Sequence, residues 1–339
     1  MRPARLGGRA ALAAAILAAA ACGAPRPSGL ERVTFMMPRY LSSAVGFIAQ
    51  ERGFFEREGL DVELEISNRE GNALPGLVQG RIDVYTTGPL SPKYFNVVHR
   101  GARIRFVAAA GVYATQGCAY AATVARRELV ESGRLTDYAS LRGLRISSDR
   151  SASSYYLWRR ILALGGLTDD DVELIDVPTT TKLEALANGR IDVTTAVEPL
   201  VTQLVRHGDG VVWHPTSDVL PDRPSAYVVF GPRLLDERPD LGRRFLAAYT
   251  KAAAAYREEG KSERHLAILE RETRLGRDDL LAMCWTPWSP DGRIDPVPLR
   301  EYQEFALGEG LIDAVVPFEQ MVDESFLPAA GADHLAAAR

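Results

Sequence analysis

Short apolar runs alternate along this chain with longer stretches in which apolar residues recur at helical spacing. The run at residues 33–38 predicts a strand, and the pattern from Ala44 to Gly59 predicts a helix. Further apolar runs predict strands at 62–66, 144–146 and 172–177. Strands that alternate with helices predict an α/β fold whose sheets are mostly parallel.

The chain contains an internal repeat. Residues 74–84 and 183–193 are identical at seven of eleven positions, at an offset of 109 residues. In both copies, leucines three residues apart predict a helix face, and Gly80 and Gly189 stand where a helix C-cap needs positive φ. A solenoid unit is shorter than this period, so the repeat indicates two related α/β units. We interpret the shared Gly-Arg-Ile-Asp-Val segment as a packing module.

The segments that follow the two repeats are expected to face one cleft. Residues 86–89 and 194–199 come directly after the β-prone part of each copy. Ligands of open α/β sheets bind outside the carboxyl ends of the strands. Two such units that face each other would form a small-molecule site between lobes.

Composition limits the class of protein. A length of 339 residues suggests about two domains. The hydrophobic fraction of 46% and charged fraction of 25% exclude a collagen-like, disordered or multi-span membrane chain. The net charge of −4 argues against a nucleic-acid partner. Without the three arginines of the first 21 residues this charge becomes −7, so any anion site must be built locally.

The first 21 residues are predicted to be an export signal, because three arginines precede an apolar run of 12 residues, too short to span a membrane. Cys22 follows Ala-Ala as in a lipoprotein cleavage box, although Ala19 replaces the usual leucine. We therefore expect residues 22–31 to be a tether that starts at a lipidated Cys22 and holds the chain outside the cell membrane. Plain secretion and an uncleaved anchor are the alternatives. A disulfide between Cys118 and Cys284 is permitted by export but is left open.

The first predicted helix carries a recognisable pattern. Its alanine, glycine and aromatic positions, with the residues that follow, are Ala49, Gly53, Phe54, Phe55, Gly59, Leu60 and Val62. Residues 141–146, the dipeptide Glu198-Pro199 and residues 322–327 add to it. The chain resembles the solute-binding proteins of bacterial ABC importers, in the group that binds sulfonates, nitrate, taurine or the thiamine pyrimidine precursor. The resemblance covers about residues 32–328.

This resemblance implies a two-lobed type 2 periplasmic-binding-protein fold that closes on its ligand by a hinge. We assign residues 32–115 and 231–330 to lobe 1 and residues 116–230 to lobe 2. The crossovers between the lobes are expected near 111–122 and 226–230. Residues 331–339 are expected to be a disordered tail. The implied function is the capture of a small organic solute, as a monomer without cofactor or metal, and its delivery to a permease and an ATPase.

Two other classes of function stay open. The fold has enzymatic relatives, the pyrimidine synthases and the chorismate dehydratases, and it could also serve an exported sensor or partner-binding module. The pyrimidine synthases' cysteine-rich signature is absent here, and the dehydratases usually lack an export signal. Neither a phosphate-binding loop nor a nucleophile elbow occurs, and the five histidines lack metal-ligand spacing, so no enzyme is expected.

Candidate ligand contacts come first from two places in lobe 1. The loop before the first helix combines a cation with hydroxyls near free helical N–H groups, which favour anions. The end of a strand adds two threonines and a glycine that lets a ligand approach the backbone. Helix capping and surface exposure are the alternatives for this set: Arg39, Tyr40, Ser42, Ser43, Thr86, Thr87 and Gly88.

Further contacts are expected in lobe 2 and at the crossovers. A serine-rich loop opens the helix that runs to about Leu164, and its hydroxyls suit a carboxylate, sulfonate or phosphate. Asp149 and Glu198 favour a cationic or hydrogen-bond-donating ligand instead, whereas the tyrosines favour a planar one. The predicted contacts here are Ser148, Ser151, Ser153, Ser154, Tyr155, Glu198, Tyr113, Gln116 and Tyr227.

Overall fold

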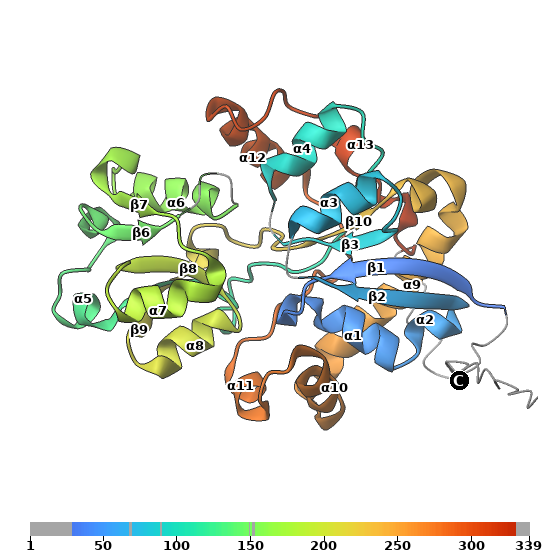
Figure 1. Ribbon diagram of the computed structural model, residues 1–339, viewed down its shortest axis with the longest axis horizontal. Helices are drawn as coiled ribbons and strands as arrows, with labels where there is room; N and C mark the ends of the chain where they lie inside the picture. The colour runs from blue at the N-terminus through green and yellow to red at the C-terminus, as the bar shows by residue number, and fades with distance from the viewer. Residues whose placement is uncertain (1–28, 68–69, 89, 149, 151–152, 330–339) are drawn as a thin grey trace, which may run out of the picture.

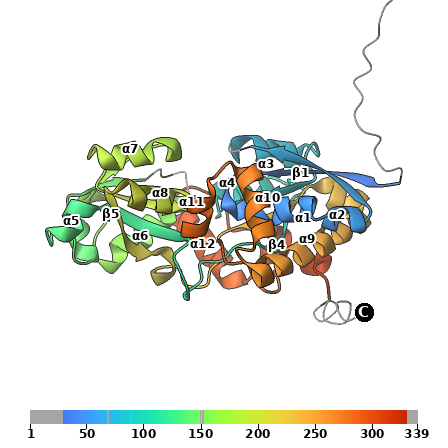
Figure 2. The same ribbon diagram turned by 90° about the horizontal axis from the view of Figure 1, so that it is seen from below.

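Two five-stranded sheets form two lobes that lie end to end along the long axis of the molecule (Figures 1 and 2). The computed structural model describes residues 29–67, 70–88, 90–148, 150 and 153–329. The predicted export signal, Cys22 and the tail at 331–339 lie outside these residues. No helix in the described ranges combines the length and the apolar character needed to cross a membrane.

The sheet of lobe 1 has the strand order β2-β1-β3-β10-β4. Strands β2, β3 and β4 run parallel to β1, and β10 is antiparallel to both of its neighbours. The bounds are β1 (Glu31–Met37), β2 (Leu60–Ile66), β3 (Val84–Thr86), β4 (Arg105–Ala109) and β10 (Tyr227–Phe230).

The sheet of lobe 2 repeats this arrangement with the order β7-β6-β8-β5-β9. Again four strands share one direction, and the fourth in order, β5, is antiparallel to its neighbours. The bounds are β5 (Ala121–Arg126), β6 (Arg145–Ser147), β7 (Glu173–Ile175), β8 (Val193–Val197) and β9 (Gly210–Pro215). The two related, mostly parallel units predicted from the repeat are confirmed.

Helices cover both faces of the first sheet (Figure 1). Below it lie α1 (Ala44–Glu51), α2 (Phe54–Arg57), α9 (Pro239–Glu259), α10 (Glu263–Thr273) and α11 (Arg277–Ala282); above it lie α3 (Glu70–Val78), α4 (Pro92–His99), α12 (Pro296–Gly308) and α13 (Phe318–Met321). The lower core contains stacked and edge-to-face aromatic pairs, such as Phe245 against Phe35 and Phe55. Such pairs stabilise a core beyond their buried area.

The second sheet is covered by four helices. They are α5 (Arg127–Glu131), α6 (Ser153–Leu164), α7 (Lys182–Ala187) and α8 (Leu200–His207). Trp158 of α6 is fully buried, and its indole N–H donates to the Ser147 carbonyl at 2.9 Å. This bond fixes α6 against the carboxyl end of β6, and the start of the helix is thereby placed beside the junction of the lobes.

The repeated motif is a packing module, as interpreted from the sequence. Gly80 and Gly189 have φ of 69° and 71°, the left-handed conformation expected after a helix. The aspartate of each copy then accepts a hydrogen bond from a backbone N–H on the neighbouring segment: Asp83 from Thr34 and Asp192 from Arg145, both at 2.9 Å. Each aspartate thus joins its own strand to the strand beside it.

Two sequence-based boundaries were wrong. Residues 227–230 were assigned to lobe 2 and its crossover, but β10 pairs with β3 and β4 inside the lobe 1 sheet. An apolar strand is compatible with either lobe, so its pairing partners decided the matter. The long first helix is also divided in two, because Gly53 has φ of 68° between α1 and α2 and so interrupts the helical backbone.

Candidate functional site

A cavity of about 300 Å³ lies where the two lobes meet the crossovers. The first lobe contributes residues that follow β3, begin β10 and belong to α12. The second lobe contributes the starts of α6 and α7 and the end of β8. Representative lining residues from these elements are Leu90, Tyr227, Tyr302, Ser153, Lys182 and Thr195.

Four tyrosines form much of the polar wall: Tyr113, Tyr156, Tyr227 and Tyr302. The rings of Tyr156 and Tyr302 meet edge to face across the lobes, with centroids 5.2 Å apart. Burial raises the pKa of Tyr113, Tyr156 and Tyr227 above the ordinary value for a phenol. These side chains therefore remain neutral near physiological pH and present flat apolar faces with hydroxyl edges.

Two cations complete the lining. Lys182 begins α7, and its Nζ donates to the Thr195 carbonyl at 3.0 Å. Burial lowers the pKa of Lys182 to about 8, and the negative charge of Asp176 offsets this shift only in part. Arg223 donates from Nη2 to Glu301 at 2.5 Å. None of the described residues that line the cavity is acidic, so the lining presents cationic side chains and no anionic ones.

Four predicted contacts line this cavity: Tyr113, Ser153, Ser154 and Tyr227. They come from the first crossover, the first turn of α6 and the start of β10, which the fold brings together. Their contact with a ligand stays a prediction. Ser151, predicted beside them, lies outside the described residues.

Other predicted contacts are used elsewhere in the fold. The Tyr155 hydroxyl donates its one proton to Asp169 at 2.7 Å or to Glu309 at 3.1 Å, because Tyr155 lies on the face of α6 that packs toward α12. Gln116 is exposed and does not line the cavity. Arg39 donates to the Glu272 carbonyl and thereby ties the loop before α1 to the end of α10.

The remaining lobe 1 contacts also lie away from the cavity lining. Thr86 and Thr87 are buried; the Thr86 hydroxyl lies 3.5 Å from that of Tyr249, and the Thr87 hydroxyl donates to the Gly88 carbonyl. Tyr40 and Ser42 are half-buried beside α1, and Gly88 is exposed. The buried hydroxyl of Ser43, and that of the predicted lobe 2 contact Ser148, have no hydrogen-bond partner among the described residues. Ligand contact by this group stays a prediction.

The lining residues that sequence reasoning missed include the polar side chains Tyr156, Lys182, Arg223 and Tyr302. A signal for Lys182 was available, because it follows the predicted strand at 172–177 and so stands near the carboxyl end of a sheet strand. Arg223 and Tyr302 had no local signal, because a turn and a helix far away in the sequence bring them to the site.

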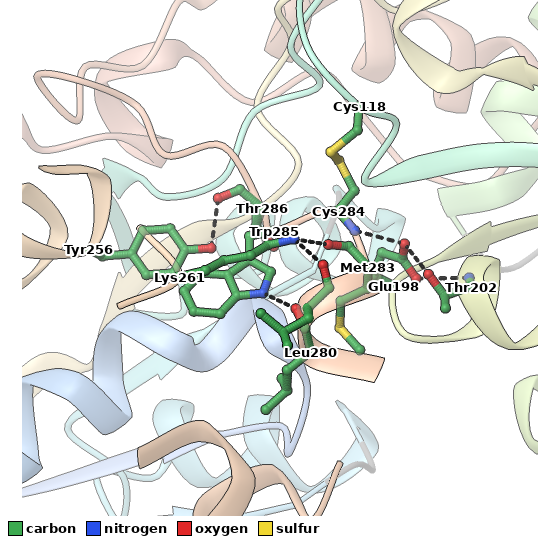
Figure 3. The surroundings of a disulfide bond; sticks show 11 residues. Cys118, Glu198, Thr202, Tyr256, Lys261, Leu280, Met283, Cys284, Trp285 and Thr286 are labelled. Carbon is green, nitrogen blue, oxygen red and sulfur yellow. Dashed lines mark hydrogen bonds between the residues drawn. A yellow bond between two sulfur atoms is a disulfide. The ribbon is translucent and has the colours of Figure 1, made fainter. Parts of the chain in front are cut away.

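Cys118 and Cys284 form a disulfide beside this junction (Figure 3). Cys118 lies in the segment between β4 and β5, whereas Cys284 follows α11. Glu198, predicted to contact a ligand, instead accepts from the Cys284 N–H at 3.0 Å and from the N–H and hydroxyl of Thr202 at 2.9 and 2.8 Å. The side chain therefore connects lobe 2 to the segment after α11.

We expect Glu198→Gln to lower the free energy of unfolding by about 1–2 kcal/mol. Glu198 is only 2% exposed, and an amide NH₂ in place of one carboxylate oxygen would face an N–H or O–H that now donates to it. Urea denaturation measures the loss. Glu184→Gln, on the exposed surface of α7, is the matched control and should change the free energy by less than about 0.5 kcal/mol. Equal stability of Glu198→Gln and the parent chain would contradict the role of Glu198 as a connection between the lobes.

No group of three or more His, Cys, Asp or Glu side chains placed to hold a metal ion occurs in the described part of the chain. The lining instead offers hydroxyl groups, aromatic rings and two cations, which suit the non-covalent binding of a small molecule.

Comparisons by sequence find one matching family and a small set of curated relatives. The model of a family described as the NMT1-like family matches residues 31–269. A Brucella abortus (strain 2308) protein named "Putative binding protein" is 26% identical over 219 residues, which are 63% of each chain. The chain thus spans 63% of the length of the curated relatives it matches.

Several solved structures share the fold. The periplasmic aliphatic sulphonate binding protein SsuA of Escherichia coli is 16% identical with a TM-score of 0.72, over 86% of this chain and 92% of its own. The nitrate-binding protein NrtA of Synechocystis PCC 6803 is 16% identical with a TM-score of 0.69, over 88% and 87%. The desulfurization enzyme DSZB is 17% identical with a TM-score of 0.64, over 87% and 97%. At these identities the similarity shows the two-lobed fold alone.

Proposed function

The chain belongs to the NMT1-like family, and from this premise we propose that it is the extracytoplasmic solute-binding component of an ABC importer. The observation that carries the proposal is the cavity between the lobes, to which both sheets and both crossovers contribute side chains. A small solute enclosed there would contact both lobes at once and so favour their closed arrangement.

The similar proteins support this proposal. The Brucella relatives are named as binding proteins, and SsuA and NrtA are named for the sulphonate and nitrate that they bind. We further propose that the closed form is recognised by a permease with its ATPase, and that the mature chain is held outside the cell membrane through Cys22 as a monomer. A disulfide is compatible with such an oxidising location.

Enzymatic turnover is the weaker alternative. The DSZB structures show that an enzyme occurs on a similar fold, and a fold by itself does not specify a reaction. The two cysteines in the described ranges are joined to each other, so neither offers a thiolate nucleophile. The cavity lining also lacks a carboxylate or histidine among its described residues that could act as a general base.

A thermal-shift screen of the purified chain tests the proposal. We expect at least one compound among sulfonates, nitrate, taurine, pyrimidines and aromatic carboxylates to raise the melting temperature. A ligand at about 100 times its Kd should stabilise the folded chain by about 2.7 kcal/mol. Mass spectrometry of the recovered ligand should show it chemically unchanged. Absence of any stabilising compound, or conversion of the ligand into a product, would contradict solute capture.

A further inference from the structure

The charge of Lys182 is not balanced by a neighbouring carboxylate. Its ammonium group has three N–H donors, of which one bonds to the Thr195 carbonyl. Within the described ranges, no carboxylate oxygen lies within ion-pair distance of Nζ, and Asp176 acts on it only from further away. Removing a charge from water without a counter-ion is costly, so an anion in the cavity would be strongly favoured beside Lys182.

Arg223 and Tyr156 add unused hydrogen-bond donors to the lining of the same cavity. The charge of Arg223 is balanced by Glu301, but its buried Nη1 has no hydrogen-bond partner among the described residues. The hydroxyl of Tyr156, a residue that is 7% exposed, has no partner at hydrogen-bond geometry either in those ranges, and the Arg223 guanidinium is near enough to oppose the rise of its pKa. A buried donor without a partner costs free energy that an acceptor oxygen of a ligand would recover.

The rest of the cavity is suited to a flat apolar body. Tyr113, Tyr156, Tyr227 and Tyr302 line it together with aliphatic side chains such as Leu90. Aromatic side chains pack well against a planar ring. The volume of about 300 Å³ is at the lower end of the range for small-molecule sites. Nitrate or a similarly small ion would leave most of this space unfilled.

We propose that the cavity selects a ring-sized organic monoanion, whose acidic group is held by Lys182 with donors from Arg223 and Tyr156 and whose flat body lies against the tyrosines. This inference rests on the proposed function, solute capture, and gives that function a ligand class. A single negative charge is inferred because Lys182 is the one lining cation within the described ranges whose charge has no ion-pair partner.

The pH dependence of binding follows from the groups around Nζ. These are Asp176, the Thr195 carbonyl and, elsewhere in the lining, Arg223 with its partner Glu301. Burial lowers the pKa of Lys182 to about 8, and binding of an anion would favour the charged form. Affinity should therefore be constant below about pH 7 and fall about tenfold for each pH unit well above 8. The buried tyrosines stay protonated over this range.

Titration calorimetry of the full chain with benzoate, benzenesulfonate, benzamide and nitrate tests the inference. We expect benzoate or benzenesulfonate to bind at least about tenfold more tightly than uncharged benzamide or small nitrate. Lys182→Gln should weaken binding of the ring anion by at least about tenfold, whereas Lys182→Arg should retain binding and lose the pH dependence. Lys93→Gln, on an exposed position of α4, is the matched control and should bind normally.

The outcomes separate this inference from the proposed function. The inference of a ring-sized anion is overturned if Lys182→Gln binds the ring anion as tightly as the parent chain, or if benzamide binds as tightly as benzoate. It is also overturned if only neutral or cationic compounds bind, although that result still supports solute capture. A chain that binds no compound at all contradicts solute capture itself. The melting temperature of unliganded Lys182→Gln should be unchanged or higher, because a desolvated cation is removed. Lys182→Arg gives a second test, the pH dependence of binding, which does not depend on the stability of Lys182→Gln.

Discussion

Replacement of both Cys118 and Cys284 by serine is expected to lower the free energy of unfolding by about 5 kcal/mol. The bond joins residues separated by 166 positions, and a crosslink that closes so long a loop removes much conformational freedom from the unfolded chain. It also ties the segment between β4 and β5 to the segment after α11, where Cys284 is 5% exposed. Urea denaturation under oxidising conditions measures the effect.

Treatment with a reductant supplies the control for this prediction. Reduction should destabilise the parent chain by a similar amount, because it opens the same loop, and should leave the double-serine variant unchanged. A parent chain with the same urea midpoint before and after complete reduction would show that this disulfide does not contribute to stability.

Replacement of Asp192 by alanine is expected to lower the free energy of unfolding by about 2 kcal/mol, because it removes a buried acceptor of several charge-assisted hydrogen bonds. Asp192 is 5% exposed and accepts from the backbone N–H of Arg145 at 2.9 Å and from its guanidinium at 2.9 and 2.7 Å. It also accepts from Arg126 at 3.2 Å. Its loss would leave the junction of β6 and β8 without this connection.

The internal repeat supplies a matched comparison. Asp83 occupies the equivalent position in lobe 1 but bonds to one backbone N–H and one arginine, so Asp83→Ala should cost less than Asp192→Ala. Asp313→Ala, which removes a surface ion pair with Arg100, should change stability by less than about 0.5 kcal/mol. A larger loss for Asp83→Ala than for Asp192→Ala would contradict this ordering.

The two aspartates should also differ in their response to acid. Burial raises the pKa of Asp83 above its ordinary value, because its hydrogen bonds do not compensate fully. Burial opposes ionisation of Asp192 as well, but the hydrogen bonds from Arg145 outweigh it and hold that pKa below its ordinary value. The stabilising contribution of Asp192 is therefore present above about pH 4 and is lost as the pH falls through its lowered pKa. The deficit of Asp192→Ala should accordingly shrink in acid, as urea denaturation near pH 3 would measure.

Much of the fold could be predicted from local patterns. The two copies that end in Gly80 and Gly189 predicted helix, turn and strand, because a helix face and a positive φ each leave a signature within a few residues. Their repetition at an interval of domain size predicted two related sheets. Ligands of α/β sheets bind outside the carboxyl ends of the strands, and this rule predicted that Ser153 and Ser154 lie near a cleft. Both residues do line the cavity.

Side-chain direction and pairing partners could not be predicted in this way. Tyr155 and Tyr156 are adjacent in the sequence, yet the first bonds to Asp169 and the second lines the cavity, because successive helical residues point about 100° apart. Glu198 stands at the expected strand end, but the backbone N–H of Cys284 reaches it from the other lobe.

The sequence by itself therefore determined the class of fold, the two related units and the family, because helix faces, glycine turns and repeats are local or periodic. Tertiary structure alone decided which sheet holds β10, that Cys118 meets Cys284, and that Arg223 and Tyr302 share a cavity with Lys182. These contacts join residues far apart in the chain, and no local pattern encodes the path that brings them together. The chemistry of the cavity depends on those contacts.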